Sequence, residues 1–252
     1  MSERIGLDWF LPLLAAPFIG SFLGLVIRRL EVGGAVIFAR SSCPHCSHRL
    51  GARDLVPILS WALSGGRCRY CAAPIGMFYP AVEVAAILVA VWAATVLSEW
   101  LVWAGCGLGW TLLTLAAIDQ RHLILPDQLT LPLVPAGLVV AYLVEPGSLI
   151  DHAGGAAAGF VALVLIAWAY KAVRGRRGLG LGDAKLLAGA GAWVSWVGLP
   201  SVVLLAAATA LSVVLVRSVA WRPVALTDEV PFGPYLCLGT WLVWLYGPLI
   251  MA

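Results

Sequence analysis

Residues 80–97 read Pro-Ala-Val-Glu-Val-Ala-Ala-Ile-Leu-Val-Ala-Val-Trp-Ala-Ala-Thr-Val-Leu, and their one charged side chain is Glu83, near the start. A run of about 20 apolar residues is what an α-helix needs to cross a bilayer. A similar run precedes this one, at residues 9–30, and six follow it. We therefore expect about eight transmembrane helices; the later runs cover residues 100–118, 129–144, 153–171, 183–199, 200–217 and 231–250.

The composition of the whole chain agrees with this pattern. Of the 252 residues, 62% are hydrophobic and only 12% are charged, and the mean hydropathy is +0.95. These values exclude an ordinary soluble domain and leave no room for a large extramembrane catalytic domain. The expected fold class is an all-α polytopic membrane protein in contact with membrane lipid. The net charge of +3 does not indicate a nucleic-acid partner.

Residues 31–79 interrupt the apolar pattern with glycine, proline, serine, arginine and four cysteines. A segment this polar and irregular cannot cross lipid, so it predicts a small soluble insert. The sequence is thus divided into a first transmembrane helix (1–30), the insert (31–79) and a membrane core of seven helices (80–252).

The basic residues predict the orientation. With eight spans, one side of the membrane holds fifteen of the sixteen Lys and Arg residues, and only Arg4 lies opposite. Cytoplasmic loops carry an excess of Lys and Arg, so this side is predicted to be the cytoplasm and both termini to be periplasmic. The loops on the basic side are residues 31–79, 119–128, 172–182 and 218–230.

Two Cys-x-x-Cys pairs stand in the insert, Cys43-Pro-His-Cys46 and Cys68-Arg-Tyr-Cys71, with 21 residues between them. This spacing is typical of a four-cysteine zinc site, which would stabilise a segment that has almost no hydrophobic core. A closed site of this kind has no open position for water, so the zinc is expected to be structural. His45 and His48 are alternative ligands. A redox dithiol would require the oxidising side of the membrane.

Two aspartates stand at helix ends on the predicted cytoplasmic side. Asp119 ends the third span, and Asp183 opens the sixth, after Gly180 and Gly182. Two carboxyl groups at the same depth could share a proton and act as acid and base. The alternatives are that Asp183, near Lys185, merely caps its helix, or that both acids serve proton-coupled transport.

Other acidic and thiol side chains receive less specific interpretations. Glu83 lies one turn into the second span, facing the insert, where it could pair with an arginine. Asp127 is expected to cap the next helix, and residues 228–229 to lie in a solvated loop. Cys106 and Cys237 are expected to be small apolar fillers.

Short motifs follow one another along nearly the whole chain. Those in the first part are Gly20-Ser-Phe-Leu23, Arg28-Arg-Leu30, Arg40-Ser-Ser-Cys-Pro-His-Cys46, Pro57-Ile-Leu-Ser-Trp61, Gly66-Arg-Cys-Arg-Tyr-Cys71 and Tyr79-Pro80 through Glu83. Those in the second part are Asp119, Leu125-Pro-Asp127, Gly180-Leu-Gly-Asp183, Lys185-Leu186, Gly191-Ala-Trp193 and Pro231-Phe-Gly-Pro234. In this order and spacing they resemble the type IV prepilin peptidases, membrane aspartyl peptidases that also methylate the new N-terminus of pilins.

The resemblance implies that Asp119 and Asp183 form the catalytic pair, as in the wider GxGD intramembrane proteases, with Gly180, Gly182, Lys185 and Glu83 in support. It implies prepilin and pseudopilin substrates with a basic leader, for a type IV pilus or type II secretion system, in the bacterial inner membrane. It also implies S-adenosylmethionine as the methyl donor.

Two positions depart from the pattern of the family. Gly24 and the turn at residues 54–57 stand where the family commonly has Asn. Both lie in the part linked to methylation, so a peptidase without methyltransferase activity is the first alternative. A proton-coupled transporter and a structural partner of a secretion or pilus assembly are the others. The oligomeric state cannot be read from the sequence.

Overall fold

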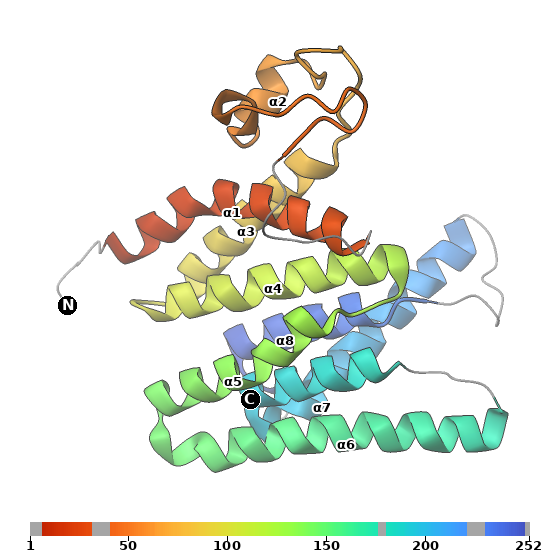
Figure 1. Cartoon of the computed structure of the whole chain (residues 1–252). Coiled ribbons are helices and arrows are strands. Elements are labelled where there is room, and N and C mark those ends of the chain that lie inside the picture. Colours follow the sequence, from red (N-terminus) through yellow and green to blue (C-terminus); the bar gives the residue numbers. More distant parts are fainter. Residues whose placement is uncertain (1–6, 32–40, 176–179, 221–229, 250–252) are drawn as a thin grey trace. The chain divides into compact units, whose positions relative to one another are not determined.

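A computed structural model describes residues 7–31, 41–175, 180–220 and 230–249. The described chain is helical, and its only β-type pairings are two isolated bridges, so the predicted all-α class is confirmed (Figure 1). Its helices are α1 Leu7–Glu31, α2 Leu59–Leu63, α3 Phe78–Val96, α4 Leu101–His122, α5 Asp127–Val144, α6 Leu149–Arg174, α7 Leu181–Ala220 and α8 Gly233–Tyr246, with short 3-10 helices at Ala52–Leu55 and Pro146–Ser148.

Six of the described helices, α1 and α3 to α7, are long and apolar enough to cross a membrane. The eight predicted apolar runs all fall on helices. Two local features explain why they give only six described helices of membrane length. The sixth and seventh runs both lie in α7, whose helical backbone is interrupted at Ser195 (φ 58°, ψ 179°). The eighth run yields the 14-residue α8, which starts just after Pro231 and ends at Gly247. Pro231 and Gly247 thus limit the length of the last helix.

The chain forms two compact units, Met1–Thr114 and Leu115–Ala252, and the boundary falls inside α4. In the first unit α1 packs against α3. Gly20 permits this approach, because a Cβ atom there would lie 2.6 Å from the Cα of Glu83. Trp110 links α4 to α3 by donating its indole N–H to the carbonyl of Ala86 over 3.0 Å. Small residues let neighbouring membrane helices come this close.

The second unit is built around α7, which packs against α5, α6 and α8. Glycines make the closest of these approaches. A Cβ atom at Gly155 of α6 would lie 2.6 Å from the backbone of Ser195, and one at Gly159 would lie 2.6 Å from the carbonyl of Leu187. Trp193 adds a directed contact from α7 to α5 by donating its indole N–H to the carbonyl of Leu133 over 3.0 Å. This packing fixes the ends of the helices that carry the candidate site.

Candidate active site and cysteine cluster

Asp119 lies near the end of α4 and is only 5% exposed. Its Oδ2 accepts a hydrogen bond of 3.0 Å from the backbone N–H of Gly233, the first residue of α8. The N-terminus of a helix carries a partial positive charge and unpaired N–H groups, so it stabilises a nearby carboxylate. The fold therefore gives this buried carboxyl group a specific polar partner inside the second unit.

Gly233 is a position whose role the sequence did not disclose. A Cβ atom there would lie 2.7 Å from Oδ2 of Asp119 and 3.2 Å from the side chain of Leu125. Only glycine lets the start of α8 come this near to the carboxyl group. In the sequence, only the Pro231-Phe-Gly-Pro234 motif pointed to this position. The structure shows that the motif contacts Asp119 through Gly233.

Asp183 lies in the first turn of α7 and is partly exposed. Its Oδ2 accepts a hydrogen bond of 3.2 Å from the backbone N–H of Gly180, just before the helix. This is a capping contact, so the alternative interpretation of Asp183 as a helix cap describes one of its interactions. A carboxylate has two oxygens and about four acceptor sites, so the same group can also take part in a pair.

Asp119 and Asp183 lie close enough for the charge of one carboxyl group to act on the other. Leu125 lies between the elements that carry them. Its Cβ would lie 3.0 Å from a Cβ at Gly182, and its Cδ2 would lie 3.2 Å from a Cβ at Gly233. The start of α7, the start of α8 and the end of α4 therefore converge on a single small region within the second unit.

Lys185 and Asp127 hold the start of α5 against the start of α7. The Nζ of Lys185 lies 2.7 and 2.8 Å from the two carboxylate oxygens of Asp127. The prediction that Asp127 caps its helix is wrong. Pro126 occupies the N-cap position, and Asp127 is the first helical residue, so its carboxylate is directed to Lys185 instead.

Cys237 lies one turn beyond Gly233 on α8 and is only 3% exposed. The thiol is within electrostatic range of both Asp119 and Asp183. Cys237 is buried, as expected for an apolar filler, but the sequence did not predict that it lies near the two aspartates. Cys106, in contrast, lies in the first unit and is fully buried.

The four cysteines of the insert form one cluster. Their sulfur atoms all lie within 4.8 Å of one another, and those of Cys43 and Cys71 are 3.8 Å apart. A tetrahedral zinc site with Zn–S bonds of about 2.3 Å places its sulfurs about 3.8 Å apart. The residues therefore fit a four-thiolate metal such as zinc. The alternative ligand His48 is stacked on the ring of Tyr70.

The two Cys-x-x-Cys segments share one backbone conformation. In each, the N–H four residues after the first cysteine donates to the carbonyl of that cysteine over 2.9 Å, from Ser47 to Cys43 and from Ala72 to Cys68. Both donors have φ of 55°, the left-handed region.

Backbone N–H groups of Cys46 and His45 lower the pKa of the Cys43 thiol to about 6, against an opposing effect of its burial. At Cys71 the hydrogen bond with the backbone of Ala73 also lowers the pKa of the thiol, but burial and the neighbouring thiols outweigh this effect and raise that pKa to about 12. Before a metal binds, the fold therefore favours the thiolate at Cys43 but not at Cys71.

Glu83, near the start of α3, is 5% exposed and faces the insert. Its Oε2 accepts a hydrogen bond of 2.6 Å from the backbone N–H of Ile58. Ile58 precedes α2 and has φ of 59°, which is unusual for a β-branched residue. Glu83 therefore holds the insert at a strained turn within the first unit. It belongs to the first unit, whereas both aspartates belong to the second.

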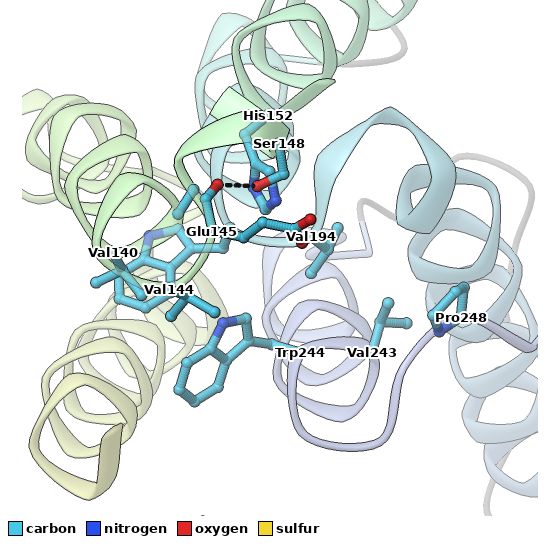
Figure 2. A pocket seen from close by; sticks show the side chains of 11 residues that line it. Val140, Val144, Glu145, Ser148, His152, Val194, Val243, Trp244 and Pro248 are labelled. Carbon is cyan, nitrogen blue, oxygen red and sulfur yellow. Dashed lines mark hydrogen bonds between the residues drawn. The ribbon is translucent and has the colours of Figure 1, made fainter. Parts of the chain in front are cut away.

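A separate cavity of about 270 Å³ lies in the second unit, at the other end of α5 (Figure 2). Glu145, Ser148 and His152 border it from the connection between α5 and α6, beside Trp244 of α8. Asp127 starts α5, and the cavity is lined by residues from Val140 to Val144 at the end of this helix, so Asp127 and the cavity are about 20–26 Å apart along the helix. Neither candidate aspartate lines this cavity.

Some predictions fall on parts of the chain outside the described residues. They are the lone periplasmic Arg4 and the solvated loop at residues 228–229.

The helices and their apolar surfaces define a multi-pass helical membrane protein. The profile of the Bacterial Peptidase A24 N-terminal domain matches residues 14–97, and that of the Type IV leader peptidase family matches residues 106–215. The chain belongs to the type IV leader peptidase family, which confirms the family and enzyme class predicted from its motifs.

Several relatives bear the name prepilin leader peptidase/N-methyltransferase. One from Aeromonas hydrophila is 38% identical over 97% of this chain and 94% of its own length. One from Burkholderia pseudomallei strain 1026b is 40% identical over 88% of this chain and 80% of its own. One from Pseudomonas aeruginosa is 34% identical over 94% and 90%. No solved structure matches the chain.

Proposed function

We propose that this protein removes the basic leader from prepilins and pseudopilins with Asp119 and Asp183, and then methylates the new N-terminus. Prepilin cleavage and methylation follow from the family and the names of its relatives. The observation that supports the pair is the convergence around Leu125 of the helix ends that carry the two carboxyl groups, with Gly233 bonded to Asp119 and Gly180 to Asp183.

In this mechanism one carboxylate takes a proton from water, and the hydroxide attacks the scissile carbonyl carbon. The protonated partner stabilises the oxyanion by a hydrogen bond and then gives its proton to the leaving amine. Two close carboxyl groups titrate as a unit, so the roles belong to the pair rather than to either residue. The N–H of Gly233 keeps Asp119 oriented throughout this cycle.

The substrate is proposed to enter from the cytoplasmic face. Both aspartates lie at helix ends on the side where the sequence places fifteen of the sixteen basic residues. A pilin-like apolar helix would lie in the bilayer beside the core, with its leader in the cytoplasm. In this arrangement residues 1–30 form the first span, 31–79 the cytoplasmic insert and 80–252 the core, and both termini are periplasmic.

Zinc is proposed as the metal of the four cysteines. With four protein ligands it would have no open coordination site, so its contribution is to hold the two Cys-x-x-Cys segments together. S-adenosylmethionine is proposed as the methyl donor.

The test is the intact mass of a prepilin from the same cell after incubation with the purified protein and S-adenosylmethionine. The wild type is expected to remove the leader and add one methyl group. Asp119→Asn and Asp183→Asn are each expected to leave the substrate uncut, because an amide cannot exchange the required proton. Asp151→Asn is the matched control, since this exposed aspartate at the start of α6 accepts a hydrogen bond from the indole N–H of Trp196 in α7 and lies outside the candidate site.

Cleavage by either single variant at the rate of the wild type would refute the pair. Leader loss without methylation would leave a peptidase alone. An uncut substrate with the wild type would favour the transporter or structural alternatives.

A further inference from the structure

A cavity in the first unit has a volume of about 670 Å³ and opens between the insert and the adjoining ends of α1 and α3. Cavities of about 300–1,000 Å³ are typical of small-molecule and cofactor sites. Neither candidate aspartate lines it, and all its lining residues belong to the first unit. The peptidase mechanism makes no use of it.

We infer that this cavity binds the methyl donor, S-adenosylmethionine, with Asp54, Glu83 and Trp61 inside and arginines at its mouth. The inference rests on the proposed methyl transfer and names where that reaction takes its donor. Its starting observation is the mixed lining, which holds five arginines, two carboxylates and three aromatic rings.

The two carboxylates lie deep, and each has a partner within the protein: Asp54 pairs with Arg69 over 3.4 Å, and Glu83 accepts a hydrogen bond from the backbone N–H of Ile58. Glu83 is 5% exposed, and the side chain of Asp54 is 12% exposed. A carboxylate has about four acceptor sites, so each can still face a cationic group of a ligand.

Arg53 and Arg67, in contrast, are exposed at the edge of the cavity. A purely anionic occupant would meet these buried acids at a cost. A zwitterion with a sulfonium, an ammonium and a carboxylate matches both signs, because its cationic centres face the acids and its carboxylate faces the arginines.

The aromatic rings suit the adenine of the donor. Trp61 is held in place because its indole N–H donates to the carbonyl of Ile75 over 3.0 Å, and its ring packs against Gly66. Tyr79 faces the same cavity from α3, and Gly24 leaves room for its ring. Flat, fixed aromatic faces bind a purine by stacking.

The cysteine cluster and Glu83 shape this cavity. Cys43 and Cys68, the buried cysteines of the two segments, form part of its wall. Glu83 holds Ile58, the residue before α2, and Ser60, Trp61 and Ser64 of α2 line the cavity. The insert thus has a task that needs no chemistry at the metal: it builds one wall of the binding site.

When bound, S-adenosylmethionine supplies the methyl group: the lone pair of the pilin amine forms the new N–C bond as the C–S bond breaks, leaving S-adenosylhomocysteine and a proton that passes to water. The residues of the cavity hold the donor and exclude water from it. The cavity and the aspartate pair share no residue, so each can be altered by substitutions that leave the residues of the other unchanged.

The experiment is equilibrium dialysis of the full-length protein in detergent against radiolabelled S-adenosylmethionine. Ser60→Phe fills the cavity from α2 and is expected to weaken binding at least about tenfold, a loss of about 1.4 kcal/mol. Leu59→Phe is its control, because this neighbouring residue does not line the cavity. Arg67→Gln is expected to weaken binding about tenfold or more by removing a charged donor. Arg49→Gln, a basic residue of the insert outside the cavity, is expected to have no effect.

A wild-type pattern in limited proteolysis shows that each variant is folded. The inference is overturned if Ser60→Phe and Arg67→Gln bind the donor as the wild type does. If those variants also methylate a pilin normally, the donor binds elsewhere and the proposed function stands. If the wild type neither binds the donor nor methylates, the proposed methyl transfer itself fails. The cavity would instead be assigned to a lipid headgroup by two results together: an anionic phospholipid copurifies with the wild type but not with Ser60→Phe, and S-adenosylmethionine does not displace this lipid from the wild type.

Discussion

The insert and the membrane core obtain their order in different ways. In the insert, α2 has only five residues, and the chain is held by four clustered thiols, a few backbone hydrogen bonds and the bond from Ile58 to Glu83. In the core, long helices pack through glycines, as where Gly155 meets the backbone at Ser195. The first depends on ligation and the second on close packing, so the two should fail under different treatments.

This difference also separates the two proposed chemistries. The aspartates lie at helix ends, where the start of α8 bonds Asp119 and the residue before α7 bonds Asp183. The cavity of the first unit depends on an insert that a metal would hold together. A change that unfolds the insert should abolish methylation first, and a change in the core should abolish cleavage first.

Of the changes that distinguish the insert from the core, removal of the metal is expected to have the largest effect. Cys68→Ser, or incubation with a strong chelator, should release the zinc and make residues 41–77 readily cleaved by protease, because a segment with little core unfolds without its metal. Limited proteolysis with mass spectrometry and metal analysis would measure this. Cys106→Ala is the control, since this buried thiol lies outside the cluster. A purified protein that contains no zinc and has a protected insert would contradict the ligation account.

Gly233→Ala is expected to have the next largest effect, a loss of about 100-fold in the rate of leader cleavage. The added Cβ would lie 2.7 Å from Oδ2 of Asp119, so α8 or the carboxyl group must move, and misplacement of about 1 Å can have this effect. The rate of prepilin cleavage measures it. Gly107→Ala, where a Cβ meets open space, is the control. Equal rates for the two variants would show that the contact has no part in catalysis.

Gly155→Ala tests the packing of the core and is expected to destabilise it by about 1–3 kcal/mol. The new Cβ would lie 2.6 Å from the backbone of Ser195 and Trp196, which cannot move as a side chain can. Thermal unfolding in detergent, followed by circular dichroism, measures the change. Gly154→Ala adds the same atom one residue earlier, where nothing lies within 4 Å, so it should unfold as the wild type does.

The smallest effect is expected for Lys185→Met. Its ion pair with Asp127 is partly exposed, with side-chain exposures of 29% and 54%, and such pairs contribute about 0–1 kcal/mol. Cleavage should fall by less than about fivefold, and Asp127→Asn should have a similar effect. A loss as large as that for Asp119→Asn would show that Lys185 acts directly on the substrate or the pair.

The sequence predicted those features that depend on local pattern. Apolar runs mark helices because each helix satisfies its own backbone in lipid, and Cys-x-x-Cys spacing marks a cluster because four thiols suit one metal. The shortness of α8 was missed although Pro231 and Gly247 mark its ends in the sequence.

The irregular backbone at Ser195 was beyond this reasoning, since Ser195 lies against Gly155 of another helix in the second unit. Asp127 was misassigned for the same reason: its partner Lys185 is 58 positions away in the sequence. The contact of Gly233 with Asp119 was not predicted either, because the two residues are 114 positions apart in the sequence.

The most direct test of the account gives two substrates, an intact prepilin and the same pilin already lacking its leader, to Asp119→Asn in the presence of S-adenosylmethionine, and measures their intact masses. The account predicts that the prepilin stays uncut and that the leaderless pilin gains one methyl group, as it does with the wild type. Cleavage of the prepilin, or failure of the folded variant to methylate the leaderless pilin, would contradict the assignment of cleavage to the aspartate pair and of methylation to a separate site.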